Sequence, residues 1–342
     1  MKNYFEHREV KSFFALFLLS RRRIILMKWI SIFQIPLFLL ASCAPARIVD
    51  APPEPTVTLF IAPTPTSTPE LITPLPTATQ IACDPFNSDF CITDGHIILQ
   101  RPVKPPANDT VDPTYRYGST ADSRREPHHG VEFLNEFGTP IYAAGEGVVV
   151  FAGPDNSAVY SPWVNFYGNL VVIRHDDDIF TLHAHLSKID VKANQQVRAG
   201  DKIGEVGQSG VATGSHLHFE VRRCGDGTDY FSTQNPELWL FPNSDEYGHP
   251  LGAMTIAILD QNSKFQFAEF TARYHLDKNG PKIKSYYVVT YSRDMALGEE
   301  NAGLGDLSPG YYRIALKYNG QIYDRWVEVK SGKLTQVVLV VK

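Results

Sequence analysis

The stretch Ser215-His-Leu-His-Phe-Glu-Val-Arg222 combines the alternation of a β-strand with two histidines on one of its faces. Side chains at positions i and i+2 of a strand point to the same face, so His216 and His218 can converge on one point. Leu217 and Phe219 would then point to the opposite face, toward a core. Such a pair on a strand is a candidate metal site, although a polar strand face would explain the pair alone.

The sequence around this stretch has the pattern of short strands separated by turns. Apolar runs at 169–175 and 179–185 flank Asp176-Asp-Asp178, which predicts a β-hairpin. Glycines at turn intervals, with no predicted helix longer than about two turns, favour an antiparallel fold. The other strand-like runs lie at 140–144, 147–152, 197–204 and 215–222. We therefore predict a mainly β chain with an antiparallel domain over residues 115–245.

A second β domain is predicted over residues 252–342. Strand-like runs recur there with turn residues between them, and Asn319-Gly320 separates two of the runs, which is a strong hairpin signal. The regular spacing favours a small β-sandwich. The stretch 306–316 resembles the transthyretin-like sandwiches that are appended to many exported enzymes. No combination of catalytic side chains is predicted in this domain.

The first 43 residues have the features of an export signal. Basic residues between positions 21 and 28 precede an apolar run at 29–40, which is too short to span a bilayer comfortably. The tetrad Leu40-Ala-Ser-Cys43 resembles the lipobox of bacterial lipoproteins. This resemblance implies that Cys43 carries a lipid and anchors the exported protein to the outer face of a bacterial membrane; an ordinary cleaved signal is the alternative. We expect Met27 to be the true start.

Two further segments are expected before the first domain. Residues 44–82 are rich in Pro, Thr and Ser and cannot bury enough apolar area to offset their ordering entropy, so they are predicted to be an extended linker. Residues 83–114 form a short pre-domain segment. With Cys43 lipidated, Cys83 and Cys91 are the natural disulfide pair in an exported protein, and Cys224 is left as a free thiol.

The charge of the chain argues against a nucleic-acid partner. Its formal net charge is −5, and no long run of Lys and Arg lies beyond the first 30 residues. Because nucleic-acid binding needs concentrated positive charge, this class of function is not expected.

Histidines concentrate in the first β domain. Seven of the eleven lie within residues 128–218, and histidine is the commonest metal ligand in proteins. His128-His-Gly-Val-Glu132 places a histidine and a carboxylate four residues apart, as in a loop that leads into a strand. Two histidines and one carboxylate leave the fourth tetrahedral position of zinc open, as in catalytic sites. His183 and His185, near the end of the predicted hairpin, are expected to share a face.

Together these motifs resemble the M23 (LytM/lysostaphin-type) metallopeptidases. That family combines an early His-x-Gly-x-Asp, a middle x-x-His-Leu and a late His-Leu-His. The resemblance covers about residues 124–223. Further supporting stretches are 138–148, 168–173, 197–204 and 213–221.

The resemblance implies a role for each of five side chains. His128, Glu132 and His218 would bind Zn²⁺, and His185 and His216 would be the catalytic imidazoles beside it. One imidazole would accept a proton from the attacking water and later help to protonate the leaving amine. The other would help to stabilise the oxyanion.

The sequence departs from the family pattern at three places. Glu132 stands where the family has aspartate, and its extra methylene requires the backbone to sit further back. His183 stands two residues before His185, where the family usually has tyrosine; it is expected either to contact the substrate or to face solvent. The segment 154–168 is longer than usual, and its aromatic side chains could line a substrate groove or belong to a packed surface loop.

The predicted function is that of a zinc-dependent endopeptidase that hydrolyses peptide bonds in the stems or cross-bridges of bacterial peptidoglycan. The alternative is a non-catalytic M23-like module that binds the cell wall or activates another hydrolase. A remoter alternative is a peptidase that processes another exported protein. Retention of both ligand histidines and both catalytic histidines favours an active enzyme.

Overall fold

The computed structural model describes residues 83–342, apart from 122–123, 224, 293–294 and 296–297. All of the described residues lie within one compact unit, residues 60–342. The predicted export signal with Cys43, the start at Met27, the linker 44–82 and the Cys224 thiol lie outside the described residues. Within the described part of the chain, no helix has the length and apolar character needed to cross a membrane.

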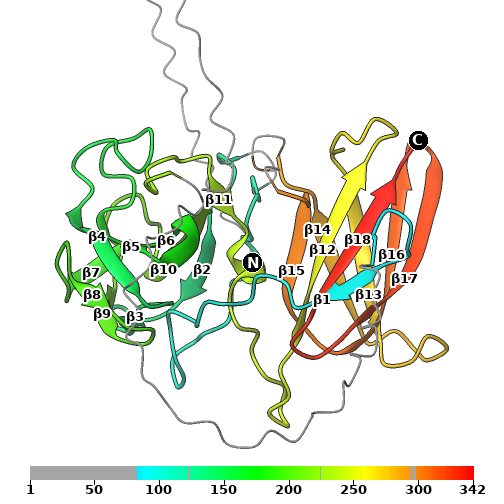
Figure 1. Cartoon of the computed structure of the whole chain (residues 1–342), viewed down its shortest axis with the longest axis horizontal. Helices are drawn as coiled ribbons and strands as arrows, with labels where there is room; N and C mark the ends of the chain where they lie inside the picture. Colours follow the sequence, from blue (N-terminus) through cyan, green and yellow to red (C-terminus); the bar gives the residue numbers. More distant parts are fainter. Residues whose placement is uncertain (1–82, 122–123, 224, 293–294, 296–297) are drawn as a thin grey trace, which may run out of the picture. The chain divides into compact units, whose positions relative to one another are not determined.

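Nearly all of the regular secondary structure in the described chain is β-strand, which confirms the predicted mainly β class (Figure 1). Its helical elements are two short 3-10 turns, η1 (Asp176–Asp178) and η2 (Pro236–Leu238). The strands before residue 240 are β1 (Cys91–Thr93), β2 (Val131–Leu134), β3 (Pro140–Tyr142), β4 (Gly147–Pro154), β5 (Asn169–Arg174), β6 (Ile179–Ala184), β7 (Leu186–Ile189), β8 (Gln196–Val197), β9 (Lys202–Val206), β10 (His216–Arg223) and β11 (Thr233–Gln234). The later strands are β12 (Gly252–Leu259), β13 (Glu269–His275), β14 (Lys284–Val289), β15 (Ala302–Leu307), β16 (Gly310–Tyr318), β17 (Gln321–Val329) and β18 (Leu334–Val340).

The widest sheet is built around β10. Its order is β11-β10-β6-β5-β4-β8, with β2 also paired to β10, and every neighbouring pair is antiparallel. Strands β5 and β6 form the hairpin predicted on either side of Asp176-Asp-Asp178, which confirms that prediction. A second antiparallel sheet has the order β3-β9-β7.

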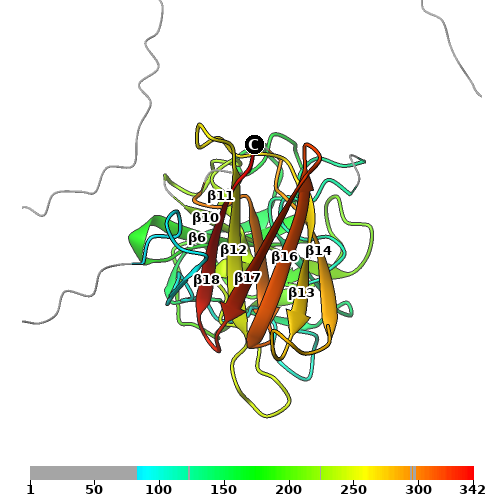
Figure 2. The same cartoon turned by 90° about the vertical axis from the view of Figure 1, so that its right-hand side faces the viewer.

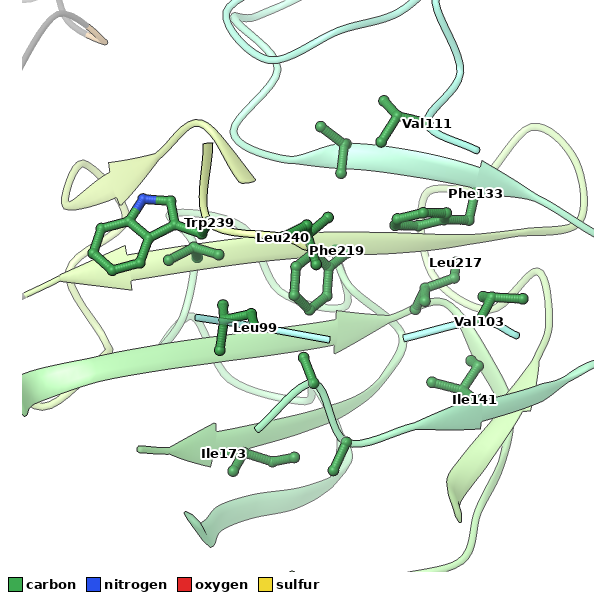
Figure 3. Packing of buried hydrophobic residues seen from close by; sticks show 14 of the residues in the cluster. Leu99, Val103, Val111, Phe133, Ile141, Ile173, Leu217, Phe219, Trp239 and Leu240 are labelled. Atoms are coloured by element: carbon green, nitrogen blue, oxygen red, sulfur yellow. The ribbon is translucent and has the colours of Figure 1, made fainter. Parts of the chain in front are cut away.

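The two faces of β10 have different surroundings. Leu217, Phe219 and Val221 point into the main hydrophobic core, in which Figure 3 shows Leu217 and Phe219 together with Phe133 of β2. Alternation along the strand therefore places the polar residues on the other face: His216, His218, Glu220 and Arg222. This core fixes the register of β10, because a slip of one residue would exchange the two faces.

The C-terminal strands form a two-sheet sandwich, as predicted. The sheets have the orders β1-β18-β12-β15 and β14-β13-β16-β17, and a second hydrophobic core lies between them. Figure 2 looks onto β17, β16, β13 and β14. Asn319 and Gly320 join β16 to β17 with φ angles of 46° and 81°, which confirms the predicted hairpin turn. Strands β12 and β18 pair in parallel.

Residues 83–114 contribute to both parts of the fold. Cys83 and Cys91 form a disulfide, and β1, which begins at Cys91, pairs with β18 of the sandwich. Further along the segment, Leu99, Val103 and Val111 are buried in the main core beside β10. The segment is therefore an integral part of the packed structure.

A buried carboxylate connects the first domain to the sandwich. Glu237 of η2 accepts hydrogen bonds from the Arg116 guanidinium and, at 3.0 Å, from the backbone N–H of Gly305 in β15. Arg116 follows Tyr115, whose ring stacks on the ring of His128 with centroids 4.0 Å apart. The contact at Glu237 therefore holds the chain segment that backs one of the predicted zinc ligands.

Replacing Glu237 with alanine should lower the free energy of unfolding by about 3 kcal/mol, because a partly buried guanidinium and a buried N–H lose their acceptor. Urea unfolding of the variant and the parent protein measures this loss. Asp94→Ala is the matched control, since its carboxylate pairs with Lys333 on the surface and its removal should have no measurable effect. Equal stability of the Glu237 variant and the parent would contradict the structural role.

Candidate metal centre and active site

Three predicted ligands meet where β2 lies beside β10. Glu132 of β2 pairs directly with His218 of β10, and His128 lies in the loop that leads into β2. One ligand atom from each of the three residues lies within 4.8 Å of the other two. The pairing of the two strands thus brings together side chains about 90 residues apart in the sequence.

Gly130, between His128 and Glu132, allows this close approach. A Cβ atom at this position would lie 2.4 Å from the carbonyl oxygen of Phe219 and 3.0 Å from Cε1 of His218. Real Cβ atoms do not approach a backbone oxygen so closely, so any larger residue would push β2 away from β10. The glycine is therefore required by packing at the metal centre.

The hydrogen bonds of His128 and His218 determine which ring nitrogens carry protons. Nδ1 of His128 lies 3.0 Å from the carbonyl oxygen of Tyr115, and Nε2 of His218 lies 3.0 Å from a carboxylate oxygen of Glu220. Both oxygens can only accept, provided that Glu220 is ionised, so both of these nitrogens must donate. In the neutral form of each ring the remaining nitrogen, Nε2 of His128 or Nδ1 of His218, carries the lone pair, and these two nitrogens face each other at 3.2 Å.

The groups that converge on the site therefore offer lone pairs to it and no N–H or O–H. The carboxylate of Glu132 lies 3.8 Å from Nε2 of His128 and adds a third acceptor. Burial and the neighbouring His218 hold the pKa of His128 well below its ordinary value, so the imidazole is neutral at pH 7. Two imidazole nitrogens and one carboxylate oxygen are a donor set that fits zinc and would leave one tetrahedral position open.

His185 and His216 lie beside these ligands. The His185 ring centroid is 4.9 Å from that of His216 and 5.6 Å from that of His218. Nδ1 of His185 donates to the carbonyl of Ser209 at 2.8 Å, and Nδ1 of His216 donates to the carbonyl of Gly214 at 2.9 Å. Each ring therefore keeps a lone pair on Nε2, and Nε2 of His216 lies 3.6 Å from Glu132.

Both of these imidazoles are neutral near pH 7. Burial, with the neighbouring His218 and His216, lowers the pKa of His185 to about 3. Burial also lowers the pKa of His216, although Glu132 opposes this shift. A neutral imidazole with an unoccupied lone pair is able to take up a proton, as a general base must.

The prediction that His183 and His185 share a face is wrong. Strand β6 ends at Ala184, and His185 adopts a left-handed conformation with φ of 63°, which breaks the alternation of the strand. His183 pairs directly with Phe219 of β10 and lies, fully buried, on the core side of the sheet. It cannot contact a substrate or face solvent; burial lowers its pKa to about 3.

A buried network behind His218 was not predicted from the sequence. Glu220 accepts from His218, from the Tyr167 hydroxyl at 2.6 Å and from the Arg222 guanidinium at 2.9 Å. Burial opposes the ionisation of Glu220, but the charge of Arg222 and the hydrogen bond from His218 outweigh it and lower the pKa of this carboxyl. Glu220 is therefore ionised and orients the His218 ring. Its position, two residues after His218, was the signal that could have revealed it.

Comparisons with known proteins place this site in a peptidase family. Residues 126–230 match peptidase family M23. The chain is 40% identical over 119 residues to peptidoglycan DD-endopeptidase ShyA of Vibrio cholerae serotype O1, an alignment that covers 32% of this chain and 26% of that protein. It is 38% identical over 109 residues to DD-carboxypeptidase/endopeptidase Mpg of Neisseria meningitidis serogroup B, covering 32% of this chain and 23% of Mpg.

Solved structures of the same family are also similar. The catalytic domain of the prophage-encoded M23 protein EnpA from Enterococcus faecalis is 27% identical, with a TM-score of 0.34 and coverage of 40% of this chain and 95% of that one. The chain spans about a quarter of the length of the curated relatives named above. The family match alone assigns residues 126–230 to peptidase family M23.

Glu220→Gln should weaken zinc binding by roughly 10- to 100-fold, because a neutral amide holds the N–H of His218 less firmly than a carboxylate. Competition with a chromogenic chelator measures the affinity. Tyr167→Phe is the graded control, since it removes one hydrogen bond to Glu220 and keeps the charge; its effect should be smaller. Unchanged zinc affinity in the Glu220 variant, together with lowered stability, would reduce the network to a purely structural role.

His183→Leu should raise the free energy of unfolding by about 1 kcal/mol, because neither ring nitrogen makes a hydrogen bond of normal geometry within the described chain. Thermal unfolding of the metal-loaded protein tests this. Zinc content and any peptidase activity should stay at parental levels. Loss of activity with normal zinc content would restore a role for His183 at the substrate.

Proposed function

We propose that this protein is a zinc-dependent endopeptidase that hydrolyses peptide bonds in the stems or cross-bridges of bacterial peptidoglycan. The observation that carries the proposal is the convergence of four imidazoles, those of His128, His185, His216 and His218, beside the Glu132 carboxylate. The substrate follows from the relatives, which are named as peptidoglycan DD-endopeptidases and as a DD-carboxypeptidase/endopeptidase. Because the alignments cover only 26% and 23% of those relatives, we propose the activity of the whole chain from the site geometry together with this partial match.

We assign the ligands and catalytic groups on the same geometry. Nε2 of His128, a carboxylate oxygen of Glu132 and Nδ1 of His218 are the proposed ligands. Zinc, when bound, supplies a positive charge that acidifies water and polarises a carbonyl. His185 and His216, whose Nε2 lone pairs lie beside the ligands, divide two tasks between them. One imidazole accepts a proton from the attacking water through its free Nε2 and passes it to the leaving amine, and the other is placed to help stabilise the developing oxyanion.

The proposed location is the bacterial cell envelope, where peptidoglycan is found. Lipidation of Cys43 would tether the enzyme to the outer face of a membrane, and residues 44–82 would allow it to reach the neighbouring polymer. A tether raises the local concentration of the enzyme at its substrate.

The test is cleavage of purified peptidoglycan by the purified full-length protein loaded with zinc. New amino groups identified by mass spectrometry would establish the activity and the bond, and they should vanish when a chelator removes the metal. One zinc bound per chain with no cleavage of the wall would overturn the proposal in favour of a non-catalytic module that binds the wall or activates another hydrolase.

His185→Ala and His216→Ala should each retain zinc and lose roughly 10²- to 10⁴-fold in rate, because each removes an acid–base group without removing a ligand. Initial rates of amino-group release and zinc content are measured on the same samples. His249→Ala is the control histidine, since it lies on the surface beside Asp245 and should keep full activity. Near-normal rates in both active-site variants would contradict their assignment.

A further inference from the structure

A cluster of aromatic side chains lies beside the metal centre and takes no part in it. This aromatic ledge consists of Trp163, Phe166, Tyr230 and Phe231. The Trp163 ring is 5.2 Å from that of Phe166 and 5.8 Å from that of Tyr230, and Tyr230 is 5.4 Å from Phe231. The ledge therefore joins two chain segments, the loop between β4 and β5 and the loop before β11.

Two of the four side chains of the ledge are exposed, while Tyr230, which contacts both of them, is buried. Trp163 is 42% exposed and Phe231 is 51% exposed, and the neighbouring Val164 and Val211 are also exposed. Leaving a contiguous apolar surface in water is unfavourable, and such patches in soluble proteins generally mark binding surfaces. None of these side chains carries a charge, so the surface suits an uncharged partner.

The loop that carries Trp163 is held in place by hydrogen bonds. The buried Asp155 accepts from the backbone N–H of Tyr167 at 3.2 Å through its carboxylate, and from that of Asn165 through its carbonyl at 2.6 Å. The Ser161 hydroxyl donates to the carbonyl of Trp163 at 2.9 Å. A surface that is held before its partner arrives loses little entropy on binding.

Buried side chains and a shared loop contact connect the ledge to the metal centre. Phe166 contacts Tyr167, whose ring lies 5.9 Å from the ring of His218. Tyr230 stacks on His129, the residue after the proposed ligand His128, with centroids 3.7 Å apart. The backbone N–H of Val211 donates to the carbonyl of Phe166 at 3.0 Å, and the carbonyl of Ser209, two residues earlier, accepts from His185. The ledge therefore flanks the loop that orients a proposed catalytic imidazole.

The chemistry of the substrate indicates what the ledge binds. Peptidoglycan consists of peptide stems of small and charged residues on strands of N-acetylated sugars. The flat C–H face of a pyranose ring packs against aromatic rings, whereas the stem peptides offer no comparable flat apolar face. We infer that the aromatic ledge binds a sugar ring of the glycan strand next to the cleaved stem, an inference that rests on the proposed function.

The test compares two substrates that share one peptide. The first is a cross-linked stem dimer without sugar, and the second is the same dimer that still carries its disaccharides. Burying roughly 60 Å² of apolar surface corresponds to about a tenfold effect on affinity. Trp163→Ala should therefore lower kcat/KM about tenfold on the sugar-bearing dimer and less than twofold on the sugar-free dimer, whereas Trp163→Phe should largely restore the difference.

Two controls separate recognition from folding. Phe267→Ala, which truncates a comparably exposed aromatic side chain in the C-terminal region, should leave both substrates unaffected. Zinc content and melting temperature show whether each variant is folded. Equal losses on both substrates, or no loss on either, would overturn the inference while leaving the endopeptidase activity established.

Binding of sugar to the ledge can also be measured without catalysis. Peptide-free glycan fragments are titrated into the zinc-loaded protein, with heat as the readout. Binding that weakens about tenfold in Trp163→Ala supports the ledge as a sugar site. Failure of the parent protein to bind the fragments would overturn it, and failure to cleave either dimer would instead count against the proposed function.

Discussion

The metal centre depends on one constraint, the fixed hydrogen bond that each imidazole makes on its outer side. In all four rings the outer nitrogen donates to an oxygen that can only accept, so the inner nitrogen keeps its lone pair for the site. The four acceptors are the carbonyl of Tyr115 for His128, the carbonyl of Ser209 for His185, the carbonyl of Gly214 for His216 and the carboxylate of Glu220 for His218. Three of the four are backbone atoms, so the protonation pattern follows directly from the course of the chain.

The strand pattern predicted the centre of this arrangement because it depends on local geometry. Alternation along β10 places His216 and His218 on one face, and the core residues Leu217 and Phe219 hold that register from the other face. The hairpins at 176–178 and Asn319-Gly320 were equally predictable, since turn residues and strand pattern agree there. The same alternation places Glu220 on the face of His218. Its role could not be predicted, because it depends on hydrogen bonds from Tyr167 and Arg222 that form only in the folded protein.

The predicted shared face of His183 and His185 was wrong because a single residue changes the path of the backbone. Alternation alone would place His183 and His185 on one face, but the left-handed conformation of His185 turns its ring to the site while His183 stays in the core. No local pattern marks this change, because histidine rarely adopts positive φ. The shared packing of residues 83–114 was hidden for a different reason: pairing of β1 with β18 joins positions more than 200 residues apart.

The sandwich contributes to the metal centre through the segment that backs His128. Tyr115 supplies both the carbonyl that orients the His128 ring and the aromatic face that stacks on it. The next residues of that segment are held from the sandwich side, Arg116 through Glu237 and Gly305, and Tyr117 by the edge of Tyr291. Because one face of the His128 pocket is fixed by these contacts, the sandwich helps to shape the metal site even though it supplies no ligand. The two β domains are therefore better regarded as one structural unit with a single reactive centre.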